Sequence, residues 1–72
     1  MRKAEAIASA VSFARENGYD PEMYDIHADT RDLRWVVHFR RKSDQTKPRP
    51  GDFFIVEVNI RSKSVERLIP GK

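Results

Sequence analysis

Residues 52–60 read Asp52-Phe53-Phe54-Ile55-Val56-Glu57-Val58-Asn59-Ile60, and this stretch decides the fold of the 72-residue chain. Its apolar side chains follow a period of two, the spacing at which side chains alternate between the faces of a β-strand. One side carries Phe54, Val56, Val58 and Ile60, and the other carries Phe53 and Ile55. A strand that is apolar on both sides typically lies in the middle of a sheet. The stretch therefore predicts a central strand.

Two alternating stretches precede it and predict a hairpin. Apolar residues at Tyr24, Ile26 and Ala28 predict an edge strand over Tyr24–Thr30. A second strand is predicted from Leu33, Trp35, Val37 and Phe39. The polar residues Asp29-Thr30-Arg31-Asp32 between them are typical of a turn.

The remaining segments predict a loop and a short last strand. The stretch from Arg41 to Gly51 contains Pro48 and Pro50 and no alternating apolar residues, which predicts a loop. Arg61-Ser62-Lys63-Ser64 predicts a turn. After it, Val65, Arg67 and Ile69 alternate with Glu66 and Leu68, and Pro70-Gly71 ends the pattern.

The N-terminal segment predicts an amphipathic helix over residues 3–17. Its apolar positions recur at intervals of three and four residues, which places them on one helix face. They are Ala4, Ile7, Ala8, Val11 and Ala14, widened by Ala10 and Phe13. Gly18 is suited to the left-handed conformation of a C-terminal cap, and Asp20-Pro21 follows it.

Together these elements predict one α+β domain over residues 1–72. The helix packs on one face of a three- to four-stranded antiparallel meander, giving a two-layer sandwich. Its expected partners are the core side chains Trp35, Val37 and Phe39. The face without the helix then carries Val36, Phe53 and Ile55. Two interpretations of that apolar face stay open: it binds another protein or a second copy of the chain, or the loop or C-terminal tail covers it.

Composition excludes several classes of protein. The chain has no cysteine, which excludes disulfides and thiolate zinc sites, and 39% of its residues are hydrophobic, which argues against disorder. No apolar run has the ~20 residues needed to span a bilayer. Glu5 interrupts the signal-like N-terminus, so we expect a cytoplasmic protein. Residues 1–36 carry a net charge of −2 (five basic, seven acidic), and residues 37–72 carry +5 (nine basic, four acidic).

Candidate chemistry centres on two histidines. His27 and His38 are predicted to be neighbours on adjacent strands, and Asp25, Asp29 or Asp52 would complete a metal or acid/base cluster. The spacing matches no metal-binding motif, which favours solvated neighbours over ligands. No serine lies in a glycine-flanked elbow and no glycine-rich phosphate loop is present. We therefore expect neither an enzyme nor a cofactor.

A basic set offers an alternative partner, a nucleic acid. Phosphates are neutralised by cations and bases stack on aromatic rings. Trp35 and Phe39, however, share the phase of the core, and Asp44 and Asp52 dilute the charge, which favours a solvated loop. The cations are Arg40, Arg41, Lys42, Lys47 and Arg49.

The order of motifs resembles small PepSY-like modules and is similar to short NTF2-fold immunity proteins. The resemblance rests on six segments of the chain. They are Ala4-Glu5-Ala6-Ile7-Ala8, Tyr24-Asp25-Ile26, Trp35-Val36-Val37-His38-Phe39, Phe54-Ile55-Val56-Glu57-Val58-Asn59, Val65 and Gly71-Lys72. The resemblance implies a binding domain without catalytic residues, an inhibitor, sensory appendage or toxin neutraliser. The chain departs from it at Arg61-Ser62-Lys63-Ser64, where those families have Thr-Gly, in its longer basic loop, and in lacking the export signal of most PepSY domains. The leading hypothesis is a protein-binding module that uses a sheet face or the edge strand Tyr24–Thr30.

Overall fold

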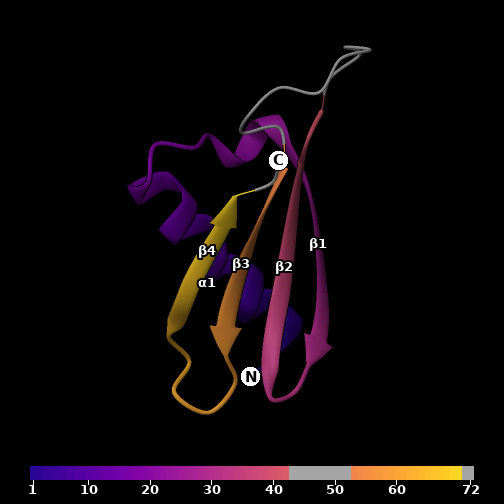
Figure 1. The fold of residues 1–72 in the computed structure, drawn as a ribbon, viewed down its shortest axis with the longest axis vertical. Helices are drawn as coiled ribbons and strands as arrows, with labels where there is room; N and C mark the ends of the chain where they lie inside the picture. The colour runs from indigo at the N-terminus through magenta and orange to yellow at the C-terminus, as the bar shows by residue number, and fades with distance from the viewer. Residues whose placement is uncertain (43–52, 71–72) are drawn as a thin grey trace.

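The fold is an N-terminal helix lying across one face of a four-stranded antiparallel sheet (Figure 1). The computed structural model describes residues 1–42 and 53–70. Its elements are α1 Lys3–Glu16, the 3₁₀ turn η1 Pro21–Met23, β1 Tyr24–Arg31, β2 Arg34–Arg41, β3 Phe53–Asn59 and β4 Val65–Pro70. This confirms the predicted two-layer α+β arrangement. No helix in the described ranges has the length and apolar content to span a membrane.

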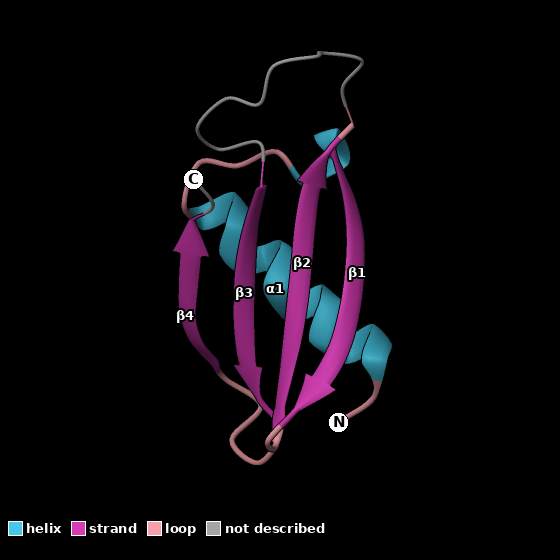
Figure 2. Cartoon of the chain, turned by 45° about the vertical axis from the view of Figure 1, so that its right-hand side comes forward, coloured by secondary structure: helices cyan, strands magenta, loops and turns pink. Residues whose placement is uncertain are grey.

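The strands lie in the sheet in chain order, β1-β2-β3-β4 (Figure 2). β3 therefore lies inside the sheet, as its two apolar sides predict, and β1 forms one edge. Phe54, Val56 and Val58 of β3 point toward α1 and are fully buried. The register aligns Phe39 with Phe54 and Val37 with Val56, so the same face of β2 contributes to the core.

The helix face that meets the sheet is centred on alanines. Ala6, Ala10 and Ala14 are fully buried, whereas Ala4 and Ala8, predicted to belong to the buried stripe, are exposed. Ile7, Val11 and Phe13 flank the alanines and pack against the core as predicted. Since the sheet side contributes large side chains, the helix approaches it with its smallest ones. Ala6 went unpredicted because the predicted stripe was centred on the row of Ala4 and Ala8, whereas the buried row is that of Ala6, Ala10 and Ala14.

The helix ends at a glycine cap, as predicted. Gly18 has φ +87°, its N–H donates to the Arg15 carbonyl at 3.0 Å, and the Tyr19 N–H donates to the Ala14 carbonyl at 3.0 Å. This pair of hydrogen bonds is the Schellman arrangement. The Tyr19 ring stacks on Phe54 with a centroid distance of 4.1 Å. The cap thus directs the chain back onto the core.

The turn between β1 and β2 differs from the prediction. β1 continues through Arg31, and the turn consists of Asp32 and Leu33, with φ +48° and +61°. Leu33 was predicted to begin the second strand in the core phase, but its side chain is 61% exposed. Two positive φ angles in a two-residue hairpin define a type I′ turn, whose twist matches that of the strands. Arg31 pairs with Arg34, so residues 29–31, which were predicted to lie in the turn, belong to β1.

The β3–β4 connection falls at the predicted turn, but the phase of β4 changes. Ile60, predicted to extend the apolar row of β3, lies in the turn and donates its N–H to the Leu33 carbonyl at 3.0 Å. A register shift between Glu57 and Val58 lets both Val65 and Leu68 pack against the core. The predicted strict alternation of Val65, Arg67 and Ile69 is therefore wrong.

The predicted loop also needs one correction. Arg41 is the last residue of β2 and belongs to the sheet. The rest of the prediction, apart from Lys42, lies outside the described residues, as do Lys47, Arg49 and Asp52.

Candidate functional site

The face of the sheet turned away from α1 is the candidate site, and we call it the open face. Residues paired across neighbouring strands share a face, so the register assigns its members. They are Asp25, His27, Asp29 and Arg31 of β1, Arg34, Val36, His38 and Arg40 of β2, Phe53, Ile55, Glu57 and Asn59 of β3, and Arg67 and Ile69 of β4.

An apolar patch, consisting of Val36, Phe53, Ile55 and Ile69, occupies the middle and one end of the open face. Val36, Phe53 and Ile55 lie on this face as predicted. Ile69 lies directly opposite Ile55 and joins them. Phe53 is 41% and Ile69 38% exposed, so the patch offers large apolar side chains to solvent. Sequence reasoning missed Ile69 as part of the site, although its place two residues after Arg67 on a predicted strand was a usable signal.

A hollow of about 370 Å³ lies beside the patch. Its walls combine apolar side chains from the patch with charged and polar ones from β1, β2 and β3. They include Asp29, Val36, His38, Ile55, Glu57 and Ile69. The hollow can therefore accept an apolar side chain while its rim contacts polar groups.

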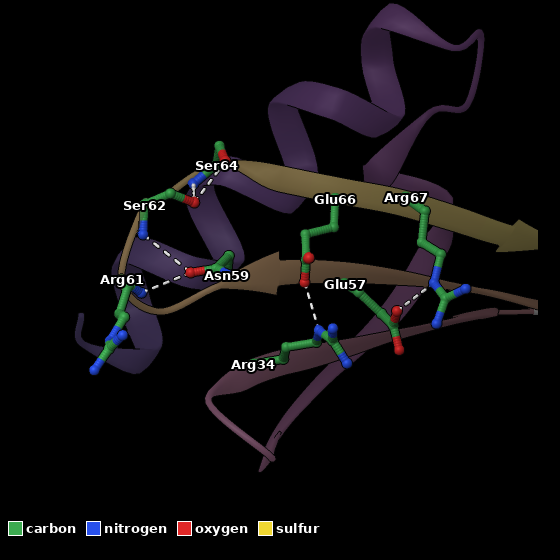
Figure 3. Close-up of polar contacts among 8 residues, drawn as sticks. All are labelled: Arg34, Glu57, Asn59, Arg61, Ser62, Ser64, Glu66 and Arg67. Carbon is green, nitrogen blue, oxygen red and sulfur yellow. Dashed lines mark hydrogen bonds and ion pairs between the residues drawn. The ribbon is translucent and has the colours of Figure 1, made fainter.

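Two ion pairs cover the end of the open face near the turns (Figure 3). Arg34 Nε of β2 contacts Glu66 Oε1 of β4 at 2.5 Å, reaching across β3. Arg67 Nε contacts Glu57 Oε1 at 2.5 Å. The hydrogen bond and the charge of Glu66 raise the pKa of Arg34 above its ordinary value. These arginines are thereby held in place and partly neutralised.

The two histidines are neighbours, as predicted. His27 and His38 are cross-strand partners with ring centroids 6.1 Å apart. His27 Nε2 lies 3.1 Å from Asp29 Oδ2, and His38 Nε2 lies 3.9 Å from the same oxygen. Asp25 lies instead opposite Arg40. Among the described residues no group of three His, Cys, Asp or Glu side chains could hold a metal ion.

The predicted basic set does not share one surface where the structure describes it. Arg40 belongs to the open face opposite Phe53, whereas Arg41 follows the phase of the core side. The exposed Lys42 comes directly after β2 and donates its N–H to the Met23 carbonyl at 2.8 Å. Phe39 is fully buried, and the half-buried Trp35 donates Nε1–H to the Met1 carbonyl at 3.3 Å. Neither ring is presented with the cations.

The described charges of the open face balance. Four arginines, at 31, 34, 40 and 67, stand against four carboxylates, at 25, 29, 57 and 66, when Glu66 is counted through its contact with Arg34. A phosphate backbone is bound by a surplus of cations. A balanced, ion-paired surface around an apolar patch is instead typical of a contact with another protein.

No protein-family model, curated protein or solved structure matches the chain. The resemblance to PepSY-like modules and NTF2-fold immunity proteins therefore stays a prediction.

Proposed function

We propose that the chain is a non-enzymatic, cytoplasmic protein-binding module of the inhibitor, immunity or accessory type, and that it binds a partner protein through the open face. The observation that carries the proposal is the apolar patch, with Phe53 41% and Ile69 38% exposed on a sheet face that α1 leaves uncovered. Protein interfaces combine such an apolar centre with a polar rim.

The chemistry of the open face defines the partner. The hollow beside Ile55 and Ile69 accepts an apolar anchor, a leucine, methionine or aromatic side chain. The paired arginines and carboxylates around it favour a partner surface with charges of both signs. The balanced charge supports a protein over a nucleic acid.

Photo-crosslinking in the producing cell tests the proposal. A photoreactive amino acid at Phe53 should link the chain to a protein, whereas the same probe at Ser12, exposed on α1, should not. The partner is then purified and its affinity is measured for Phe53→Lys and Ile69→Lys. We expect each variant to bind at least about tenfold more weakly.

Leu33→Lys is the matched control, because Leu33 is apolar and exposed but lies in the β1–β2 turn. It should bind as the wild type does. Unchanged affinity of Phe53→Lys and Ile69→Lys would refute the proposal. Recovery of cross-linked nucleic acid alone would favour the alternative that uses Arg40, Arg41, Lys42, Lys47 and Arg49.

A further inference from the structure

β1 forms one edge of the sheet, and no described strand pairs with the outer side of its residues 25–31. β1 is the first strand in the sheet order, and α1 lies behind the strands (Figure 1). Sheet edges with free backbone groups pair readily with another strand unless they are protected.

The register identifies which backbone groups of β1 point outward. The Lys42 N–H donates to the Met23 carbonyl, so residues 23 and 42 form a hydrogen-bonded pair. Hydrogen-bonded and non-hydrogen-bonded pairs alternate along an antiparallel ladder. Asp25, His27 and Asp29 therefore bond to β2, and the N–H and C=O groups of residues 26, 28 and 30 point away from the sheet.

The two edges of the sheet differ in their protection. β4 ends at Pro70, which has no N–H, and the ladder joining it to β3 is irregular between Glu57 and Val58. Prolines and bulges are devices that keep edges from pairing. β1 contains no proline, no lysine and no register shift against β2. Of the two edges, β1 is the one fit to receive a strand.

We propose that β1 pairs antiparallel with β1 of a second copy of this chain, about a two-fold axis that passes beside Ala28. The outward-pointing backbone groups of Ala28 then bond to Ala28 of the second copy, and those of Ile26 bond to Thr30 of the second copy. The two sheets become one continuous eight-stranded sheet, with both open faces on the same side.

Charge complementarity favours this register over the two adjacent ones. With the axis at Ala28, Asp25 lies opposite Arg31 of the second copy and His27 opposite Asp29, and each contact occurs twice. These are non-hydrogen-bonded pairs, in which side chains lie closest. Moving the axis by one residue to His27 places Asp25 opposite Asp29 twice, and moving it to Asp29 places the two Asp29 side chains opposite each other. Like charges directly opposite each other destabilise a sheet.

The β1 side chains on the face that packs against α1 also allow this pairing. Ala28 is the smallest side chain of β1, so two copies meet at the axis without bulk between them. Half-buried Ile26 gains the methyl group of Thr30 as a neighbour. The contact is short, and interfaces of small area are weak. We expect a dimer that forms in the micromolar range.

Sedimentation velocity over a concentration series tests the pairing in the full chain. Asp25→Arg and Arg31→Asp each place like charges opposite each other twice in the homodimer, and each should raise the dissociation constant about tenfold. An equimolar mixture restores both opposite-charge pairs in the heterodimer, and its affinity should return to that of the wild type. Arg61→Asp, a charge reversal in the exposed β3–β4 turn, is the control and should leave dimerisation unchanged.

Thr30→Pro supplies a second variant that does not rely on charge. Its N–H points outward, so proline removes no hydrogen bond within the chain but blocks the pairing with Ile26. Circular dichroism confirms the fold, and the variant should be monomeric. A wild type that stays monomeric over the whole series, a Thr30→Pro variant that dimerises normally, or a mixture that does not recover affinity overturns the inference.

The inference stands apart from the proposed function, because it uses the edge of β1 and not the open face. Phe53→Lys should lose the partner protein but keep the dimer, and the dimer is measured in the purified chain with no partner present. Failure of one proposal is thus distinguishable from failure of the other.

Discussion

Phe39 and Phe54 lie directly opposite each other on β2 and β3, with ring centroids 4.5 Å apart and ring planes 10° from parallel. Both are fully buried, and Tyr19 and Tyr24 also pack against Phe54. Phe54 is thus the centre of an aromatic cluster that joins the helix cap to three strands. Its two neighbours in the chain, Phe53 and Ile55, belong to the opposite face.

This placement predicts unequal effects at neighbouring positions. Phe54→Leu should lower the free energy of unfolding by about 1–2 kcal/mol and Phe54→Ala by about 3–5 kcal/mol, since a buried aromatic side chain is removed. Phe53→Ala is the matched control, because Phe53 is 41% exposed, and its effect should stay within about 0.5 kcal/mol. Urea denaturation gives both values. Equal losses at the two positions would contradict the assignment of faces.

The β1–β2 turn predicts a stabilising substitution. Leu33 has φ +61°, a conformation that costs residues with a Cβ about 1–2 kcal/mol and costs glycine almost nothing. Leu33→Gly should therefore raise the free energy of unfolding by about 1 kcal/mol, as measured by urea or thermal denaturation. Leu33→Ala keeps the Cβ and should bring no such gain. A type I′ turn at this position is refuted if alanine and glycine have the same effect.

The β3–β4 turn depends on one amide side chain. Asn59 Oδ1 accepts hydrogen bonds from the backbone N–H groups of Arg61 at 2.8 Å and Ser62 at 3.0 Å. Asn59→Ala should cost about 1 kcal/mol and speed hydrogen exchange at these two amides. Asn59→Asp keeps the acceptor oxygen and should preserve both. Unchanged exchange in Asn59→Ala would show that the side chain does not hold the turn.

The two ion pairs of the open face should differ in strength. The Glu57 side chain is only 14% exposed, so Arg67→Met leaves a poorly hydrated carboxylate without its partner and should cost about 1–2 kcal/mol. The double variant Arg67→Met/Glu57→Gln should recover most of that loss. Arg34 and Glu66 are both more exposed than Glu57, so Arg34→Met leaves a better hydrated carboxylate and should cost less than Arg67→Met.

Salt and pH give further checks on these pairs. Added salt should reduce the effect of Arg34→Met more than that of Arg67→Met, because the Glu66 carboxylate is open to solvent ions whereas Glu57 is largely shielded from them. The raised pKa of Arg34 means that its contribution is fully present below the pKa of the unfolded chain and is lost only as the pH rises through the folded value. Arginine stays charged throughout the ordinary range, so this contribution should not vary near neutral pH. Equal salt sensitivity of the two variants would contradict the difference in exposure.

Sequence reasoning reached the architecture because the strongest signals were long and periodic. Phe53 to Val58 is apolar on both sides, which placed β3 inside the sheet and put Phe53 and Ile55 on the face opposite the core. Gly18 predicted the helix end because glycine can adopt the left-handed conformation of a cap, and its φ of +87° confirms this. The predicted position of Val36 followed from the same alternation.

The details that sequence reasoning missed depend on geometry that no local pattern encodes. Positive φ angles are normally predicted from glycine. The Asp32-Leu33 turn has none, so its two positive φ angles could not be predicted from its residues. The irregularity between Glu57 and Val58 shifts the phase of β4 after Val65, which brings Leu68 to the core as well. To predict the contact between Arg34 and Glu66, one must know the register of both the β2–β3 and the β3–β4 ladders.

The strand order has a consequence for how the molecule forms. Because every strand pairs with its neighbour in the chain, each strand after β1 pairs with one that has already been synthesised. Contacts between segments close in sequence require little loop closure, and domains built from them fold rapidly, on the millisecond scale for mixed α and β proteins. The first hairpin, from Tyr24 to Arg41, is then available as a template before residues 53–70 leave the ribosome.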